Sequence, residues 1–285
     1  VSRNSLNVMA GHDDVYALLP SGYTILFGSN PQEAADLAAI AYRSSTLALI
    51  PAANAMDGFS TSHMQSEVRL PEPEMLKHFL GDPRDRIQCP SVAQEILFGA
   101  RGRFWQLKHF LEHHSLEFEA LAFKELNIFL GENELQLEQD SEETLLETTL
   151  QWVPLELQGN WKRQWIHAHR KGSRQRVPAL VDPHSPGLTG GVQNQPDFQA
   201  GIADHITHFA SEVPRFVVQA MKEYTALTGR EYRPVQTAWT DDAEWVLLGM
   251  GSVTDDAEAV ASYLRRQGHR VGVVSVKLFH PFPEA

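Results

Sequence analysis

The sequence predicts an α/β protein built from two parallel-sheet domains with a mainly helical insertion between them. Three observations lead to this fold class. A short apolar strand at 24–29 is followed by a helix and by a second apolar strand at 47–53, which is the order of a βαβ unit. The same order returns near the C-terminus, at 245–278. Between the two units, residues 92–130 carry apolar side chains at helical spacing.

In the first unit, one helix is predicted between the two strands. Pro31 suits the first turn of a helix, because its fixed φ is helical and its missing N–H would be unpaired there. Apolar side chains then recur at helical spacing. They are Ala34, Ala35, Leu37, Ala38 and Ala41. The strand at 47–53 should pair in parallel with the strand at 24–29.

A polar loop at 56–63 is the main candidate site. It follows the predicted carboxyl end of a parallel strand, which is where α/β folds bind ligands. Asp57, Thr61, Ser62 and His63 bring an acceptor, two hydroxyl donors and a titratable imidazole together. We therefore expect these four side chains to face a cofactor or substrate.

The second unit repeats the order of strand, turn, helix and strand. Its predicted bounds are 245–250 for the first strand, 251–252 for the turn, 254–267 for the helix and 271–278 for a parallel strand. Thr254 is predicted as the N-cap, because its hydroxyl can accept a hydrogen bond from the first turn. Acidic residues in the first turn and basic residues in the last suit the helix dipole. They are Asp255, Asp256, Arg265 and Arg266.

The glycine turn before this helix has two interpretations. A turn of this kind can bind a phosphate at the helix N-terminus. Asp255 and Asp256 would repel a phosphate there, so an ordinary connection from strand to helix is favoured.

Residues 91–178 are predicted to form the insertion. Apolar periodicity predicts helices at 92–98, 104–114 and 117–130, and an acidic stretch follows. His109 and His113 have the spacing of a zinc-binding helix, but without a third ligand no metal site is predicted. A basic run closes the insertion and could bind a phosphate-rich ligand such as coenzyme A, or an acidic carrier protein, although a solvated loop is favoured. The run consists of Lys162, Arg163, Arg170, Lys171, Arg174 and Arg176.

Composition narrows the function class. The chain has 285 residues, 42% of them hydrophobic, and a formal net charge of −12. Nucleic acids and anionic membranes attract basic surfaces, so neither is an expected partner. No apolar run approaches the roughly 18 residues of a membrane span, and a cytoplasmic location is expected. The single Cys89 cannot hold an iron-sulfur cluster without other ligands.

Several segments together resemble the pyruvate:ferredoxin (flavodoxin) oxidoreductases, in the order found in that family. The loop DGFSTSH at 57–63 resembles the family's DGFRTSHE, and GHDDV at 11–15 resembles its GDHxDV. The remaining matches are SGY at 21–23, GGVQN at 190–194, LTGREYRP at 227–234, GMGS at 249–252 and VKLFHPF at 276–282.

The resemblance implies how the chain is divided. Residues 1–90 would be the latter half of a three-layer thiamine-binding-like domain, the one that binds the pyrimidine. Residues 91–178 would be the insertion, and 179–234 a return to the first domain and a linker. Residues 235–285 would belong to a three-layer, transketolase-C-terminal-like domain. The family's second thiamine domain and its cluster-binding cysteines would lie outside this chain.

The resemblance also implies an activity. Family members oxidise pyruvate or another 2-oxoacid to acyl-CoA and pass electrons to ferredoxin or flavodoxin. Thiamine diphosphate with Mg²⁺, iron-sulfur clusters and coenzyme A would take part, in a homodimer of the parent protein. His12, Gln193 and Asn194 join the candidate site residues through the matched motifs. No catalytic residue is assigned, because the glutamate that contacts the thiamine pyrimidine would precede Val1.

Four positions depart from the family pattern. Leu19, Ser60, Thr189 and His280 stand where the family has arginine. None of these side chains can hold a carboxylate or phosphate as a guanidinium does. Two alternatives stay open, the first because of these replacements and the long insertion, and the second because it fits the same order of strand, turn and helix. One is a catalytically altered paralogue that acts as an interaction or regulatory module, and the other is a transketolase-like subunit without clusters.

Overall fold

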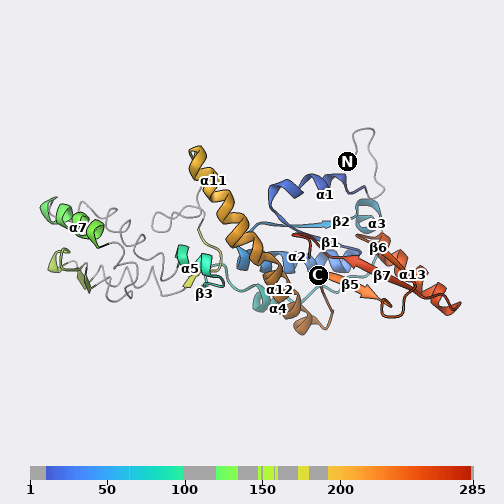
Figure 1. Ribbon diagram of the computed structural model, residues 1–285. Coiled ribbons are helices and arrows are strands. Elements are labelled where there is room, and N and C mark those ends of the chain that lie inside the picture. The colour runs from blue at the N-terminus through green and yellow to red at the C-terminus, as the bar shows by residue number, and fades with distance from the viewer. Residues whose placement is uncertain are drawn as a thin grey trace. The chain divides into compact units, whose positions relative to one another are not determined.

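The structure is a computed structural model (Figure 1), and it describes residues 11–63, 65–98, 120–133, 147–148, 150–156, 158–159, 173–179 and 192–283. The chain forms two compact units. Val1–Gly81 and Ile202–Ala285 make the first, and Asp82–Gly201 make the second. Helices and strands alternate along the first unit, so the α/β prediction is confirmed. The predicted boundaries at 90, 178 and 234 stay predictions.

The first sheet of the first unit is built on a βαβ element. Strand β1 (Thr24–Gly28), helix α2 (Pro31–Ala48) and strand β2 (Ala52–Met56) follow one another, and β1 and β2 pair in parallel from Thr24↔Ala52 to Gly28↔Met56. Helix α2 starts with Pro31 in its first turn, as predicted, and Asn30 caps it by accepting a 2.9 Å hydrogen bond from the Glu33 N–H.

The predicted position of the second strand is wrong. Residues 47 and 48 are the last turn of α2, Leu49 ends the helix with φ 59°, and β2 begins only at Ala52. Leu47, Ala48 and Ile50 are buried all the same. A short apolar run fits a buried helix end as well as a strand, so periodicity alone does not separate the two.

The first sheet is mixed rather than wholly parallel. Its described strands lie in the order β2-β1-β8, and β8 (Leu278–His280) runs antiparallel to β1. Helix α2 packs on β1 and β2 and contacts α12 (Val213–Thr228) on its other side, and α4 (Pro73–Leu80) packs on both helices. One buried apolar cluster joins this sheet to these helices, and Leu26, Leu37, Phe216 and Leu278 belong to it. Short elements complete this part of the unit, namely α1 (Asp13–Ala17), η1 (Leu19–Ser21), α3 (Gly58–Ser62), η4 (His205–Phe209) and η5 (Ala210–Glu212). Helix α11 (Gln195–Asp204) begins in the second unit and ends in the first.

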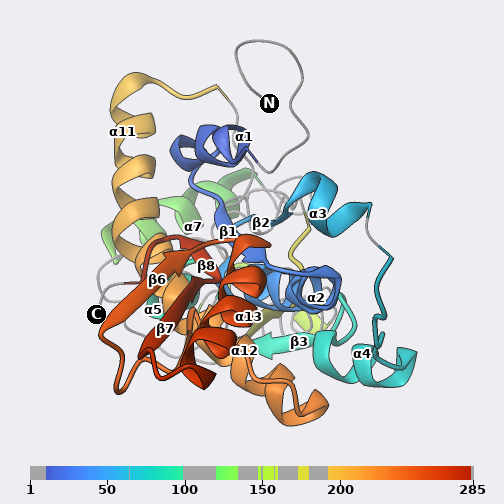
Figure 2. The same ribbon diagram turned by 90° about the vertical axis from the view of Figure 1, so that its right-hand side faces the viewer.

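A second mixed sheet follows α12. Its described strands lie in the order β5-β7-β6, with bounds Val235–Ala238, Val271–Val276 and Trp245–Gly249 respectively. Strands β6 and β7 are parallel, whereas β5 is antiparallel to β7. Helix α13 (Val253–Arg266) packs on β7 (Figure 2). The acidic first turn and the basic last turn of this helix are confirmed.

The predicted strand at 271–278 is divided between the two sheets. Strand β7 ends at Val276, and β8 begins at Leu278 in the other sheet. Lys277 lies between them, and its backbone accepts a 2.8 Å hydrogen bond from the Phe27 N–H and donates one of 2.9 Å to Pro234 O. Its side chain is buried beside Glu33, so the chain crosses between the sheets at a fixed point.

In the second unit, the described residues include two of the predicted helices. These are α5 (Val92–Phe98), at the predicted bounds, and α7 (Ala120–Glu132), which overlaps the prediction at 117–130. The predicted helix at 104–114, with His109 and His113, lies outside the described residues, as do the first four members of the basic run. Strands β3 (Arg86–Gln88) and β4 (Ser173–Gln175) pair antiparallel.

Arg174, one of the two described members of the basic run, does not belong to a solvated loop. It lies on β4 and is 2% exposed, and its Nε donates a 2.7 Å hydrogen bond to Oε1 of the buried Gln94. One of its terminal nitrogens donates to the carbonyls of Gln175 and Arg176, at 2.8 and 2.7 Å. Burial lowers the pKa of Arg174 to about 10. The solvated-loop interpretation is therefore wrong for Arg174, whose hydrogen bonds anchor β4 to α5.

The motif LTGREY is explained by a buried carboxylate on α2. Asp36 has no exposed side-chain surface and accepts hydrogen bonds from Arg230 (2.6 and 2.9 Å), Tyr224 (2.6 Å), Tyr232 (2.6 Å) and Gln32 (3.1 Å). Burial alone would raise the pKa of Asp36, but hydrogen bonds from Arg230 and the two tyrosines outweigh it, and its pKa lies below the usual range. These contacts bind α2 to α12 and to the segment after it.

No helix in the described residues is long and apolar enough to cross a lipid bilayer.

We predict that Asp36→Asn lowers the free energy of unfolding by about 3 to 5 kcal/mol, because it removes the buried charge that accepts hydrogen bonds from the partly exposed Arg230 guanidinium and from two phenols. Denaturant unfolding of the wild-type and variant chains measures this. Glu231→Gln, which removes an exposed partner of Arg233, is the matched control and should change stability little. Equal losses in the two variants would contradict the role given to Asp36.

A pH dependence follows from the lowered pKa of Asp36. The folded state keeps this group ionised at a lower pH than the unfolded chain does, so its contribution is complete above the ordinary aspartate pKa of about 4. The contribution is lost as the pH falls through the folded-state pKa. The difference in unfolding midpoint between the wild type and Asp36→Asn should therefore shrink as the pH is lowered. A difference that stays constant with pH would contradict the pKa assigned to Asp36.

Candidate functional site

The loop after β2 lies where it was predicted, at the carboxyl end of a parallel strand. Asp57 is its first residue and is 3% exposed, and the residues after it form the short helix α3. The aspartate therefore points into the protein and not into solvent.

Both oxygens of the Asp57 carboxylate are used in hydrogen bonds. Oδ1 lies 2.6 Å from Nε2 of His12, and Oδ2 accepts a 2.5 Å hydrogen bond from the backbone N–H of Ser252. Ser252 is the N-cap residue of α13, and its own side chain makes no capping hydrogen bond. The carboxylate of Asp57 thus supplies the acceptor and the negative charge that the start of α13 requires.

The hydrogen bond between Asp57 and the Ser252 N–H decides between the two interpretations of the glycine turn, in favour of an ordinary connection from strand to helix. This N–H, the group a phosphate would take, is already held by Asp57. The predicted N-cap role of Thr254 is wrong, because its hydroxyl donates a 2.8 Å hydrogen bond to Gly251 O and lies 2.7 Å from the Ser29 hydroxyl and 3.0 Å from that of Ser275. Thr254 ties α13 to both sheets instead.

Gly251 is required by the closeness of this contact. Its φ of +80° lies in the left-handed region, where residues with a Cβ are strained. A Cβ at this position would lie 2.5 and 2.9 Å from the two Asp57 oxygens and 2.9 Å from the Phe27 ring. Only glycine lets the carboxylate approach the turn.

His12 completes the group of residues that we call the Asp57 cluster, namely His12, Phe27, Asp57, Gly251 and Ser252. The His12 ring packs against Phe27 of β1 with centroids 4.7 Å apart. Its side chain is 23% exposed, against 1% for Asp57. The sequence identified both residues as candidates, and the structure adds that they are partners.

The rest of the loop divides into buried and exposed parts. Thr61 is buried, and its hydroxyl has no hydrogen-bond partner among the residues that the structure describes. Ser62 and His63 are exposed. The Ser62 hydroxyl donates to Gly58 O and lies 2.7 Å from Nδ1 of His63, whose ring stacks on Phe59. Thr61 therefore offers a buried hydroxyl, and His63 an accessible imidazole.

The other candidates are placed less directly. Gln193 and Asn194 are exposed, just before α11, in the second compact unit, so a contact with the Asp57 cluster stays a prediction. Among the positions without the family arginine, Ser60 is exposed, and Nδ1 of His280 lies 2.7 Å from Tyr23 O. Thr189 lies outside the described residues.

The sequence did not indicate a second polar group beside the Asp57 cluster. The Lys277 ammonium, on a side chain 3% exposed, donates 2.5 Å hydrogen bonds to Glu33 and to the Ser29 hydroxyl. The Ser29 N–H donates to the same Glu33 oxygen at 2.7 Å, and Asn30 donates a 3.0 Å hydrogen bond to Asp255 on α13. A lysine inside the apolar segment 271–278 was the only available signal for this group.

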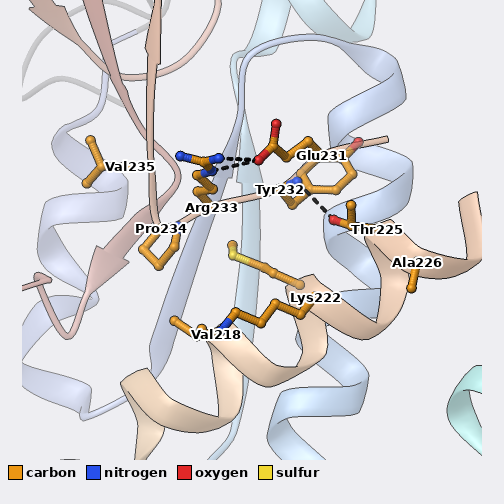
Figure 3. A pocket seen from close by; sticks show the side chains of 10 residues that line it. Val218, Lys222, Thr225, Ala226, Glu231, Tyr232, Arg233, Pro234 and Val235 are labelled. Carbon is orange, nitrogen blue, oxygen red and sulfur yellow. Dashed lines mark hydrogen bonds and ion pairs between the residues drawn. The ribbon is translucent and has the colours of Figure 1, made fainter. Parts of the chain in front are cut away.

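An open pocket of about 610 Å³ lies elsewhere in the first unit (Figure 3). It is formed by α12 and the segment leading into β5, and Val218, Pro234 and Val235 give it apolar walls. Lys222 extends along it, and Arg233 and Glu231 form an ion pair at its side (Figure 3). None of the sequence candidates lines this pocket, so it gives no support to the predicted site.

Among the described residues, no group of three or more His, Cys, Asp or Glu side chains could hold a metal ion.

We predict that Gly251→Ala destabilises the chain by more than Gly229→Ala does. The two glycines have similar φ values, +80° and +72°, but a Cβ at 229 meets nothing within 4 Å. Gly229→Ala should cost about 1 to 2 kcal/mol from backbone strain alone, whereas Gly251→Ala also displaces the turn from Asp57. Denaturant unfolding measures both, and equal costs would contradict the close packing of Asp57 on this turn.

Two family matches cover the ends of the chain. Residues 1–121 match the thiamine diphosphate-binding family of pyruvate flavodoxin/ferredoxin oxidoreductases, and residues 243–285 match core domain II of pyruvate:ferredoxin oxidoreductase. Asp57 lies in the first match and Ser252 in the second, so their hydrogen bond joins the two.

Curated relatives align over nearly the whole chain. The pyruvate-flavodoxin oxidoreductase of Klebsiella pneumoniae is 26% identical over 282 residues, and the pyruvate:ferredoxin oxidoreductase of Moorella thermoacetica is 23% identical over 282 residues. Each alignment covers 99% of this chain and 16% of the relative. The pyruvate synthase subunit PorA of Methanothermobacter thermautotrophicus is 30% identical over 104 residues, which are 36% of this chain and 27% of that subunit. Two ordered family matches and relatives aligned from end to end lead to one conclusion: the chain is a segment of a protein of the pyruvate:ferredoxin/flavodoxin oxidoreductase family.

Proposed function

We propose that the chain is part of an enzyme that oxidatively decarboxylates a 2-oxoacid, with pyruvate as the first candidate, and forms acyl-CoA. Electrons would pass to ferredoxin or flavodoxin, the carriers named for the relatives. One observation carries this proposal. The polar loop at the carboxyl end of β2, inside the thiamine-binding match, is fixed by Asp57 to the N-cap residue of α13, inside the domain II match.

The described residues fit thiamine diphosphate in part. The buried Thr61 hydroxyl, without a partner among them, offers a hydrogen bond to a cofactor or substrate. The Ser252 N–H is taken by Asp57, and no described cluster suits Mg²⁺, so the diphosphate and its metal would be held by other residues. Thiamine diphosphate, when bound, supplies the carbanion stabilisation that loss of carbon dioxide requires. Asp57, Thr61, Ser62 and His63 would shape the wall beside it, and Gln193 and Asn194 would brace that wall.

Further features of the whole protein are part of the proposal. Residues before the insertion would belong to a three-layer thiamine-binding-like domain, and those from 235 to a transketolase-C-terminal-like domain. Iron-sulfur clusters would be held by cysteines outside this chain, because Cys89 is its only one. The parent protein would be a cytoplasmic homodimer with coenzyme A as co-substrate. The relatives' names favour this enzyme over a catalytically altered paralogue, even though four family arginines are replaced.

The direct test uses the intact parent protein, purified without oxygen. We expect reduction of a viologen dye that depends on both thiamine diphosphate and coenzyme A, with pyruvate or another member of a 2-oxoacid panel. Omitting each cofactor in turn is the control. Absence of turnover with every 2-oxoacid, when thiamine diphosphate and clusters are demonstrably bound, would overturn the proposal and favour the altered paralogue.

A further inference from the structure

His12 and Asp57 have the arrangement of an acid-base pair. The Asp57 carboxylate is buried. One of its oxygens accepts a hydrogen bond from the Ser252 N–H, and the other lies against the imidazole of His12. A carboxylate only accepts hydrogen bonds, so Nε2 of His12 must carry the hydrogen. In the neutral ring the second nitrogen, Nδ1, then holds a lone pair and can accept a proton.

The surroundings of His12 keep that second nitrogen available. No described residue makes a hydrogen bond to Nδ1, and the side chain keeps 23% of its surface exposed. The ring is held on Phe27, so its orientation is fixed from both sides. The charged groups near it are Asp57 from the end of β2 and Asp13 and Asp14, which follow it in the chain. All three are acidic, and Asp57 contacts the ring.

Building on the proposed function, we propose that His12 is the residue that accepts the proton of the coenzyme A thiol, and that Asp57 is its positioning residue. The S–H bond breaks, its electron pair stays on sulfur, and the proton moves to Nδ1 of His12. The products of this step are a thiolate, which is the nucleophilic form of the co-substrate, and an imidazolium whose charge Asp57 offsets. No oxidant or second reactant enters the step.

Two substitutions separate the ability of His12 to accept a proton from its hydrogen bond to Asp57. His12→Gln carries an amide N–H that can still donate to Asp57 but has no basic nitrogen. Asp57→Asn has one acceptor and one donor. With the acceptor on Ser252, its amide would donate to Nε2 of His12 and move the ring hydrogen to Nδ1, where a proton can no longer be accepted. Both variants keep a hydrogen bond at the position that joins β2 to α13.

We expect kcat/KM for coenzyme A to fall at least about 100-fold in both variants of the intact protein, as for loss of a general base. The loss should be far smaller for release of carbon dioxide from the 2-oxoacid without coenzyme A, because that step needs no thiol. The acid limb of kcat/KM for coenzyme A against pH should flatten in His12→Gln. His78→Gln, at an exposed site on α4, is the control and should behave as wild type.

A second readout does not depend on turnover. Diethyl pyrocarbonate acylates unprotonated imidazole nitrogens, and peptide mass mapping of the intact protein identifies which histidines react. His12 should react, and saturating coenzyme A should slow that reaction at least about tenfold, while the exposed His78 reacts at an unchanged rate.

The possible failures can be told apart. Turnover of no 2-oxoacid by the wild-type protein would refute the proposed function. Wild-type turnover together with an unchanged kcat/KM for coenzyme A and an unchanged pH profile in His12→Gln would overturn the role of His12. Equal acylation of His12 with and without coenzyme A would overturn it as well.

Discussion

The arrangement of the site depends on the buried carboxylate of Asp57. A negative charge with almost no exposed surface is costly unless strong donors compensate it, and here the imidazole of His12 and the first N–H of α13 do so. The three groups come from the N-terminal segment, the end of β2 and the turn after β6. This side chain therefore joins the loop after β2, inside the thiamine-binding match, to the start of α13, inside the domain II match. Thr254 and Lys277 make further contacts between the two sheets.

Two other buried charged side chains, Asp36 and Lys277, also join segments that are distant in the sequence. Asp36 holds α2 against α12 through a guanidinium and two phenols, and Lys277 holds the crossing between β7 and β8 against Glu33. Each charge lies where a helix meets a sheet or a segment far along the chain, and each is compensated within hydrogen-bond distance. The first unit is therefore specified by a few polar contacts of defined geometry in addition to its apolar core.

Much of the fold could be predicted from the sequence, because local signals determine it. Pro31 and Asn30 begin α2, the apolar run at 245–249 gives β6, and the charge pattern of α13 follows the helix dipole. Long-range contacts could not be predicted. The crossing at Lys277 is decided by pairing with a strand some 250 residues away, and the roles of Thr254 and Arg174 by partners distant in the sequence. The end of α2 could not be told from a strand, because the apolar run after residue 46 fits both. Asp57 and His12 were found as candidates by their motifs, but their pairing needs the tertiary structure.

An experimental structure of the intact parent protein with thiamine diphosphate bound would test the account most directly, through the surroundings of one carboxylate. The account predicts that both Asp57 oxygens stay within hydrogen-bond distance, about 3.2 Å or less, of Nε2 of His12 and of the Ser252 N–H. The His12 ring would present its Nδ1 edge toward the co-substrate side. An Asp57 carboxylate turned away from α13 to contact the thiamine or its metal ion would contradict the account, because the start of α13 would then lack the acceptor that the account assigns to it.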